Sequence, residues 1–172
     1  MTYTQQHIAE TIDVLNHLDQ SAVESLVTAL VELRSRGGRL FIVGVGGSAG
    51  NASHAVNDFR KLAEIETYTP TDNVSELTAR ANDEGWETTF EAWLQGSRLS
   101  KIDGVLCLSV GGGSKERNIS MNIVRALEYS KQVGATIMGI VGRDGGATKE
   151  MGDAVVLVPV VNDLTVTPHS ES

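Results

Sequence analysis

Two glycine-rich segments, each following an apolar run, constrain the fold of this chain most strongly. Residues 40–51 read LFIVGVGGSAGN and residues 105–114 read VLCLSVGGGS. Glycine tolerates positive φ angles and lets backbone N–H groups approach an anion, and the N-terminus of a following helix adds a favourable dipole. The pattern predicts two strands that each end in a phosphate-sized loop. Tight turns without a ligand are the alternative, but both loops carry serine, and open α/β sheets bind ligands at the carboxyl ends of their strands.

The loops do not match the known nucleotide-binding motifs. Residues 44–49 read GVGGSA and lack the third glycine of the dinucleotide fingerprint, and neither loop contains Gly-Lys-Ser/Thr. A formal net charge of -8 also disfavours nucleic-acid binding, which depends on clustered lysine and arginine. A small phosphorylated molecule, held by local geometry, is the better interpretation.

Length and composition suit a single domain over residues 1–172, with a helical arm over residues 4–36. The only cysteine, Cys107, lies in an apolar run, which favours a core residue in a reducing compartment over a nucleophile. The chain shows no secretory leader and no apolar stretch near the length of a membrane span. We therefore predict a cytoplasmic protein with no membrane partner.

The apolar spacing predicts the order of helices and strands. Spacings of three and four over residues 4–36 indicate one or two amphipathic helices, ended by Gly37-Gly38, and such an arm favours a homo-oligomer. Beyond it, strands rich in Val and Ile alternate with helices, as in a doubly wound parallel sheet. We predict strands at 39–43, 65–69, 104–109, 135–141 and 154–159, and helices at 48–62, 74–82, 86–100 and 114–133. Residues 168–172 resemble a helix start, and we expect a C-terminal helix beyond them.

Four ordered motifs resemble the SIS (sugar isomerase) domain family, and within it the phosphoheptose isomerases, which interconvert sedoheptulose 7-phosphate and glycero-manno-heptose 7-phosphate. The likeness covers most of the chain. It implies an α/β fold with a five-stranded parallel sheet flanked by helices, a flavodoxin-like three-layer sandwich, and a tetramer or dimer built partly from the first helix. The motifs are GVGGS at 44–48 followed by ASH at 52–54 and Asp58, LTARANDEG at 77–85, LSVGGGS at 108–114, and GIVGRDGG at 139–146.

The resemblance also implies a sugar-phosphate site. Ser48 and Asp83 match positions that touch the sugar, and Ser109 and Ser114 match hydroxyl positions that hold the phosphate. Val45 stands where relatives have asparagine, and Val110 and Gly111 stand where they have hydroxyl residues, so backbone N–H groups are expected to hold more of the phosphate, or the ligand differs. The predicted substrate-binding residues are Gly46, Gly47, Ser48, Asp83, Ser109, Gly112, Ser114 and Glu171.

Aldose–ketose conversion moves a proton between C1 and C2 through a cis-enediol, so it needs a base near the C–H bond and a group that handles the oxygen. In similar isomerases a glutamate four residues after a histidine shares this work with a histidine on the last helix. Here His54 is followed by Asp58, a carboxylate one methylene shorter, and the second histidine is expected beyond Ser172. Spacing alone also allows an inward, hydrogen-bonded His54 and an Asp58 paired with Arg60 or Lys61.

Some relatives bind zinc on the same face, and by that likeness His54, Asp58 and Glu171 are the candidate zinc ligands. The other histidines are given no catalytic role: His7 and His17 are placed on the solvated edge of the first helix, and His169 at a helix start. Trp86, Phe90 and Trp93 are interpreted as a buried helix stripe, and Arg143–Gly146 as a turn with Asp144 capping. The alternatives to a phosphoheptose isomerase are a non-catalytic phosphosugar-binding protein and an isomerase of another sugar phosphate.

Overall fold

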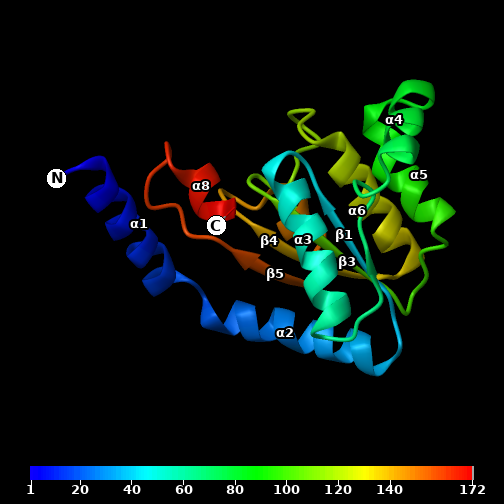
Figure 1. Cartoon of the computed structure of the whole chain (residues 1–172), viewed down its shortest axis with the longest axis horizontal. Helices are drawn as coiled ribbons and strands as arrows, with labels where there is room; N and C mark the ends of the chain where they lie inside the picture. The colour runs from blue at the N-terminus through cyan, green and yellow to red at the C-terminus, as the bar shows by residue number, and fades with distance from the viewer. Residues whose placement is uncertain (172) are drawn as a thin grey trace.

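The computed structural model describes residues 1–171; Ser172, the last residue of the predicted helix start, lies outside the described residues. Its sheet has five parallel strands in the order β2-β1-β3-β4-β5, with helices on both faces (Figure 1). The predicted doubly wound α/β fold is therefore confirmed. The strands are β1 Leu40–Gly44, β2 Thr67–Tyr68, β3 Gly104–Ser109, β4 Thr136–Val141 and β5 Ala154–Leu157.

The helices follow the predicted order, but their number and some of their bounds differ from the prediction. Residues 114–120 form a loop in which Ser114 and Ile119 pair through their backbones, so the helix predicted from residue 114 begins at Met121. Ser120 has a φ of 50°, which breaks the helix before that point. A short helix at Gly146–Met151 follows the turn after the fourth strand and was not predicted, the helix predicted at 86–100 ends at Gly96, and the terminal helix begins at Val166. The helices are α1 Tyr3–His17, α2 Gln20–Ser35, α3 Gly47–Lys61, α4 Val74–Asp83, a 3₁₀ turn Trp86–Thr88, α5 Thr89–Gly96, α6 Met121–Val133, α7 Gly146–Met151 and α8 Val166–Glu171.

The N-terminal arm is two helices rather than one. Asp19 ends the first and caps the second, because its carboxylate accepts hydrogen bonds from the backbone N–H groups of Ser21 (2.9 Å) and Ala22 (3.2 Å). The second helix, α2, packs beside β4 and β5, whereas α1 extends away from the sheet (Figure 1). Among the described residues, none of the helices combines the length and the apolar character needed to cross a membrane.

Two hydrophobic layers enclose the sheet. Leu33, Ile42 and Ala52 belong to the layer under α2 and α3, and Phe90 and Leu127 belong to the layer under α5 and α6. The predicted aromatic stripe is right for Phe90 and Trp93, which are buried in the second layer, and wrong for Trp86, which is 45% exposed and contacts the edge of Phe90. The helix register is responsible, because Trp86 lies in the 3₁₀ turn that precedes α5.

Cys107 lies in β3 with no exposed surface, which confirms its interpretation as a core residue. Burial raises the pKa of its thiol to about 12, although the hydroxyl of Thr148 donates a hydrogen bond to the sulfur at 3.2 Å. The reactive thiolate is therefore scarce at neutral pH.

We expect no reaction between Cys107 and an aromatic disulfide reagent in the native protein, and complete reaction after unfolding in guanidinium. The measurement is the absorbance of the released thiolate at pH 8. Reaction of the native thiol as fast as that of free cysteine would contradict this burial.

Candidate active site

The two glycine-rich loops meet at the point where the strand order reverses. The chain leaves β1 toward β2 on one side and returns to β3 on the other, so the loops after β1 and β3 lie next to each other at the carboxyl edge of the sheet. Ligands of doubly wound sheets bind at such switch points. The prediction that both loops lie at neighbouring strand ends is correct.

In the first loop, Gly46 has a φ of 64° and precedes α3, and no side chain caps this helix. Ser48, in the first turn of α3, is 4% exposed. Its hydroxyl donates a hydrogen bond to Oε1 of Glu171 at 3.2 Å, and the Asn51 side chain donates to the Glu171 carbonyl at 2.9 Å. The short helix α8 thus lies against the start of α3, and the Glu171 side chain lies beside Gly47 and Ser48.

The second loop is held in place by α7. The Gly112 carbonyl accepts hydrogen bonds from the backbone N–H (3.0 Å) and the hydroxyl (2.9 Å) of Thr148, and the Gly112 N–H donates to the Ser109 hydroxyl at 3.0 Å. Gly112 has a φ of 68°, and a Cβ there would collide with the Gly145 carbonyl, so only glycine suits this position. The hydrogen bond between Ser109 and Gly112 therefore helps to fix the conformation of this loop.

Two arginines that the sequence analysis did not assign lie beside Ser114. A cavity of about 130 Å³ is lined by this serine, Gly111, Arg117 and Arg143 together with Asp144. The Ser114 hydroxyl accepts hydrogen bonds from the backbone N–H (3.3 Å) and Nε (3.4 Å) of Arg117. Guanidinium groups pair well with phosphate, so this cavity suits an anion better than glycine N–H groups alone.

Asp144 plays the capping role predicted for it, since it accepts a hydrogen bond from the Gly146 N–H at 3.2 Å. It also lies 3.4 Å from the Arg117 guanidinium, with both side chains mostly exposed. For Arg117, the sequence offered one signal, its position three residues after Ser114. That position brings Arg117 to the phosphate loop because residues 114–120 form a loop and not the predicted helix.

His54 and Asp58 form a pair at some distance from the loops. Nε2 of His54 lies 3.4 Å from Oδ2 of Asp58, and the side chains are 76% and 49% exposed. Ten residues of helix separate Asp58 from Ser48, which corresponds to about 15 Å along the axis of α3. The side chain of Asp83, at the end of α4, is exposed and accepts a hydrogen bond from Asn82 at 2.8 Å.

The predicted zinc ligands do not converge within the described part of the chain. His54 and Asp58 lie together, but Glu171 is hydrogen-bonded to Ser48. Over residues 1–171 the group of three potential ligands that lie close together is instead His7, Glu10 and His169.

The environments of two histidines differ from the sequence interpretation. His7 is half-buried, and its ring stacks on that of His169 at a centroid distance of 4.8 Å, whereas His169 is 8% exposed. α8 folds back onto α1, which no local pattern indicates. His17 is exposed, as predicted.

Several known proteins with similar sequences belong to one family. No protein-family model matches the chain. The chain is 30% identical to a phosphoheptose isomerase of Helicobacter pylori over 145 residues, covering 81% of this chain and 72% of that protein. It is 31% identical to a phosphoheptose isomerase of Trichlorobacter lovleyi, with 80% and 69% covered. It is also 32% identical to the lincomycin biosynthesis protein LmbN of Streptomyces lincolnensis, over 79% of this chain but only 51% of that protein.

Solved structures agree on the fold. The phosphoheptose isomerase GmhA of Neisseria gonorrhoeae superposes with a TM-score of 0.78 at 26% identity, covering 96% of this chain and 90% of that one. A phosphoheptose isomerase of Francisella tularensis superposes with a TM-score of 0.82 at 22% identity, covering 99% and 93%. With the motif order, the switch-point loops and these relatives, the chain belongs to the phosphoheptose isomerase family of SIS (sugar isomerase) proteins.

Proposed function

We propose that this protein is an aldose–ketose isomerase of sugar phosphates that converts sedoheptulose 7-phosphate to glycero-manno-heptose 7-phosphate in the cytoplasm. The observation that carries the proposal is the pair of glycine–serine loops at one switch point, in a chain of this family. The loop after β3, with Ser109, Ser114 and the two arginines, is assigned to the phosphate. The start of α3, with Ser48 and Glu171, is assigned to the sugar hydroxyls.

The chemistry requires a proton to leave one carbon and return to its neighbour. We assign Asp58 as the carboxylate base, with His54 beside it to exchange a proton with the substrate oxygen. General acid–base groups of this kind contribute about 10²- to 10⁴-fold in rate. His54 and Asp58 offer only two neighbouring donors, which is fewer than the protein ligands of a zinc site, so the proposed mechanism uses no zinc ion.

We further propose that a second copy of the chain completes the site, in a dimer or tetramer. The separation of about 15 Å between Ser48 and Asp58 along α3 leaves the base far from the loops of its own chain. Ile8, Ile12 and Leu15, which follow helical spacing on α1, are each more than half exposed and suit contact with another copy.

A mixing experiment tests whether the site is shared. Ser114→Asp places a negative charge in the phosphate cavity, and Asp58→Asn removes the base, so each homo-oligomer is expected to be inactive. If two chains share one site, oligomers formed by refolding the two variants together regain activity, because one arrangement carries both intact groups. Mixed oligomers without activity would refute the shared site.

The substrate assay tests the function itself. Full-length protein incubated with sedoheptulose 7-phosphate in deuterated water should form the aldose, with solvent deuterium appearing at C1 or C2. The altered positions Val45, Val110 and Gly111 motivate a second candidate, a phosphosugar-binding protein without catalysis. Calorimetric binding with neither product nor deuterium exchange would favour this second candidate, and the absence of both binding and turnover would reject the two together.

Arg117→Ala and Arg143→Ala are each expected to raise the KM for the sugar phosphate about 10- to 100-fold, because a hydrogen bond to a charged group is worth about 1.5–3 kcal/mol. Steady-state kinetics over a wide substrate range measures the change. Arg125→Ala is the matched control, since Arg125 pairs with Glu87 at 3.5 Å on an exposed surface. An unchanged KM in both variants would place the phosphate elsewhere.

A further inference from the structure

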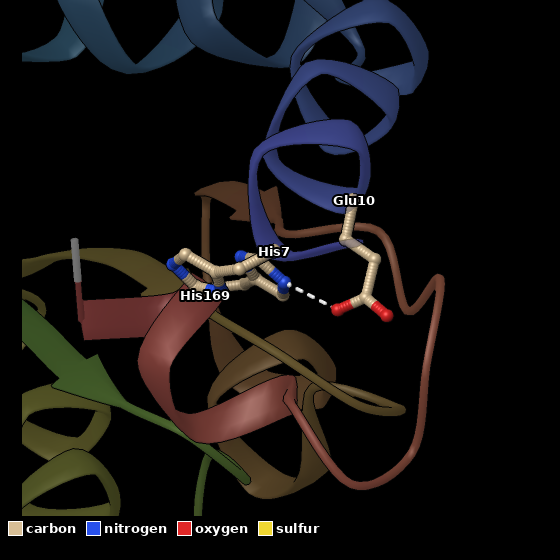
Figure 2. A group of neighbouring side chains, drawn as sticks. All are labelled: His7, Glu10 and His169. Carbon is tan, nitrogen blue, oxygen red and sulfur yellow. Dashed lines mark hydrogen bonds and ion pairs between the residues drawn. The ribbon is translucent and has the colours of Figure 1, made fainter. Parts of the chain in front are cut away.

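A second group of chemically active side chains lies between α1 and α8. Figure 2 shows His7 and Glu10 from α1 and His169 from α8 pointing toward one another. One ring nitrogen of each histidine and one carboxylate oxygen of Glu10 all lie within 4.8 Å of one another. His7 and Glu10 share a helix face because they are three residues apart. His169 and Glu171, two residues apart on α8, point to opposite sides of it, so the group is separate from the start of α3, which Glu171 contacts.

Glu10 is held as an ionised, well-oriented carboxylate. Its oxygens accept hydrogen bonds from the Asn162 amide (2.8 Å) and the Thr165 hydroxyl (2.7 Å), and Oε2 lies 3.1 Å from Nε2 of His169. These contacts, led by that of Asn162, together with one from Gln6, lower the pKa of Glu10 to about 2. Carboxylates that bind metals are usually hydrogen-bonded in this way by an outer shell.

His169 is buried, whereas His7 is half-buried and one of its ring nitrogens lacks a hydrogen-bond partner among residues 1–171. The His169 side chain is 3% exposed and the Glu10 side chain is 14% exposed. Nδ1 of His7 is buried without a hydrogen-bond partner among the described residues, although its ring stacks on His169. An unpaired buried polar group destabilises the folded state, and a bound ion is one way in which a folded protein can satisfy it.

We propose that His7, Glu10 and His169 bind a divalent transition-metal ion of the zinc class, which fastens α1 to α8. Two imidazoles and one carboxylate are a donor set that zinc takes, whereas magnesium and calcium prefer oxygen alone. Ligands about 2.1 Å from zinc in a tetrahedron lie about 3.4 Å apart, close to the separation of His169 Nε2 and Glu10 Oε2. The ligand atoms lie within 4.8 Å of one another, so the His7 nitrogen needs to move by at most roughly 1.4 Å to complete the set, and the fourth position is open to water.

This inference goes beyond the proposed isomerase activity and does not rest on it. The ion joins the N-terminal arm to the segment that carries Glu171, so it orders the arm and holds α8 against the start of α3. The residues are distinct from the His54–Asp58 pair, which allows the two locations to be separated by mutation.

The test is metal binding by the full-length protein without a histidine tag. After removal of metal with a chelator, the protein is titrated with zinc by calorimetry and with cobalt by visible absorption. We expect one ion per chain, and X-ray absorption of the zinc-loaded protein should show two imidazoles in the coordination shell. Failure to bind zinc, or a coordination shell with fewer than two imidazoles, would overturn the proposed site. Both measurements use the unmodified protein, so they do not depend on the folding of any variant.

Variants locate the ion. His7→Ala and His169→Ala should each weaken zinc binding about 100-fold or more, and Thr165→Val, which removes a hydrogen bond to Glu10, about tenfold. His17→Ala is the matched control on α1, because His17 is exposed and contacts Asp13. His54→Ala should leave the affinity unchanged. Retained affinity in folded His7→Ala, or lost affinity in His54→Ala, would show that the proposed site is wrong, whatever the isomerase assay gives.

Discussion

Asp58→Asn is expected to slow the isomerisation of sedoheptulose 7-phosphate by about 10²- to 10⁴-fold, with little change in KM. Asparagine keeps the size of the side chain but cannot accept the proton from carbon. The side chain is 49% exposed on α3, so the substitution should not unfold the protein. Steady-state kcat, with circular dichroism as a check on folding, measures the effect.

Two further variants separate the role of the carboxylate from its position. Asp58→Glu restores the longer side chain of the similar isomerases, and we expect it to keep or raise kcat, because a displacement of about 1 Å can cost roughly a hundredfold in rate. Asp13→Asn, on the exposed surface of α1, is the matched control and should leave kcat unchanged. A kcat for Asp58→Asn within threefold of the wild-type value would exclude Asp58 as the base.

Asp103→Ala is expected to lower the free energy of unfolding by about 3–5 kcal/mol, the cost of breaking a buried ion pair on one side. Asp103 is 1% exposed, and its carboxylate accepts hydrogen bonds from the Arg39 backbone (2.9 Å) and from the Arg39 guanidinium (2.8 and 3.2 Å). Ser100 adds two more at 2.9 Å through its backbone N–H and its hydroxyl. This network ties β1 to β3 at the amino ends of the strands, at the opposite edge of the sheet from the glycine-rich loops.

Urea unfolding at one fixed protein concentration measures the change, because association alters apparent stability. Glu128→Ala is the matched control. Its pair with Lys115 is short, at 2.6 Å, but both side chains are largely exposed, and such pairs contribute about 0–1 kcal/mol. An equal decrease in the free energy of unfolding for Asp103→Ala and Glu128→Ala would contradict the stabilising role assigned to the buried network.

The same network predicts a pH dependence. Burial alone would raise the pKa of Asp103, but the hydrogen bonds from Arg39 and Ser100 outweigh it and hold the pKa below the ordinary value of 3.8. The native state therefore binds the proton less readily than the unfolded state does, and the stabilisation is complete above that ordinary value. It should be lost as the pH falls through the lowered pKa, and the unfolding free energy of Asp103→Ala should depend less on pH in this acid range.

Local patterns in the amino-acid sequence were sufficient to predict several parts of this protein. The apolar runs before GVGGS and VGGGS predicted β1 and β3, and the run around Cys107 predicted its burial, because side chains on a strand enclosed on both faces must be apolar. A glycine such as Gly112 is a local signal for a positive φ, here 68°, because glycine adopts that conformation without strain. The motif order was specific enough to predict the family.

Contacts between residues that are distant in the sequence depend on the packing of whole elements, which local patterns do not report. His169 contacts Glu10 across 159 residues of sequence, and Arg117 and Arg143 reach one cavity because residues 114–120 form a loop rather than a helix. Helical spacing reports which residues share a face, but it carries no information about what packs against that face. A histidine at a helix start and one on an outer helix edge therefore appear unrelated until α8 folds back onto α1.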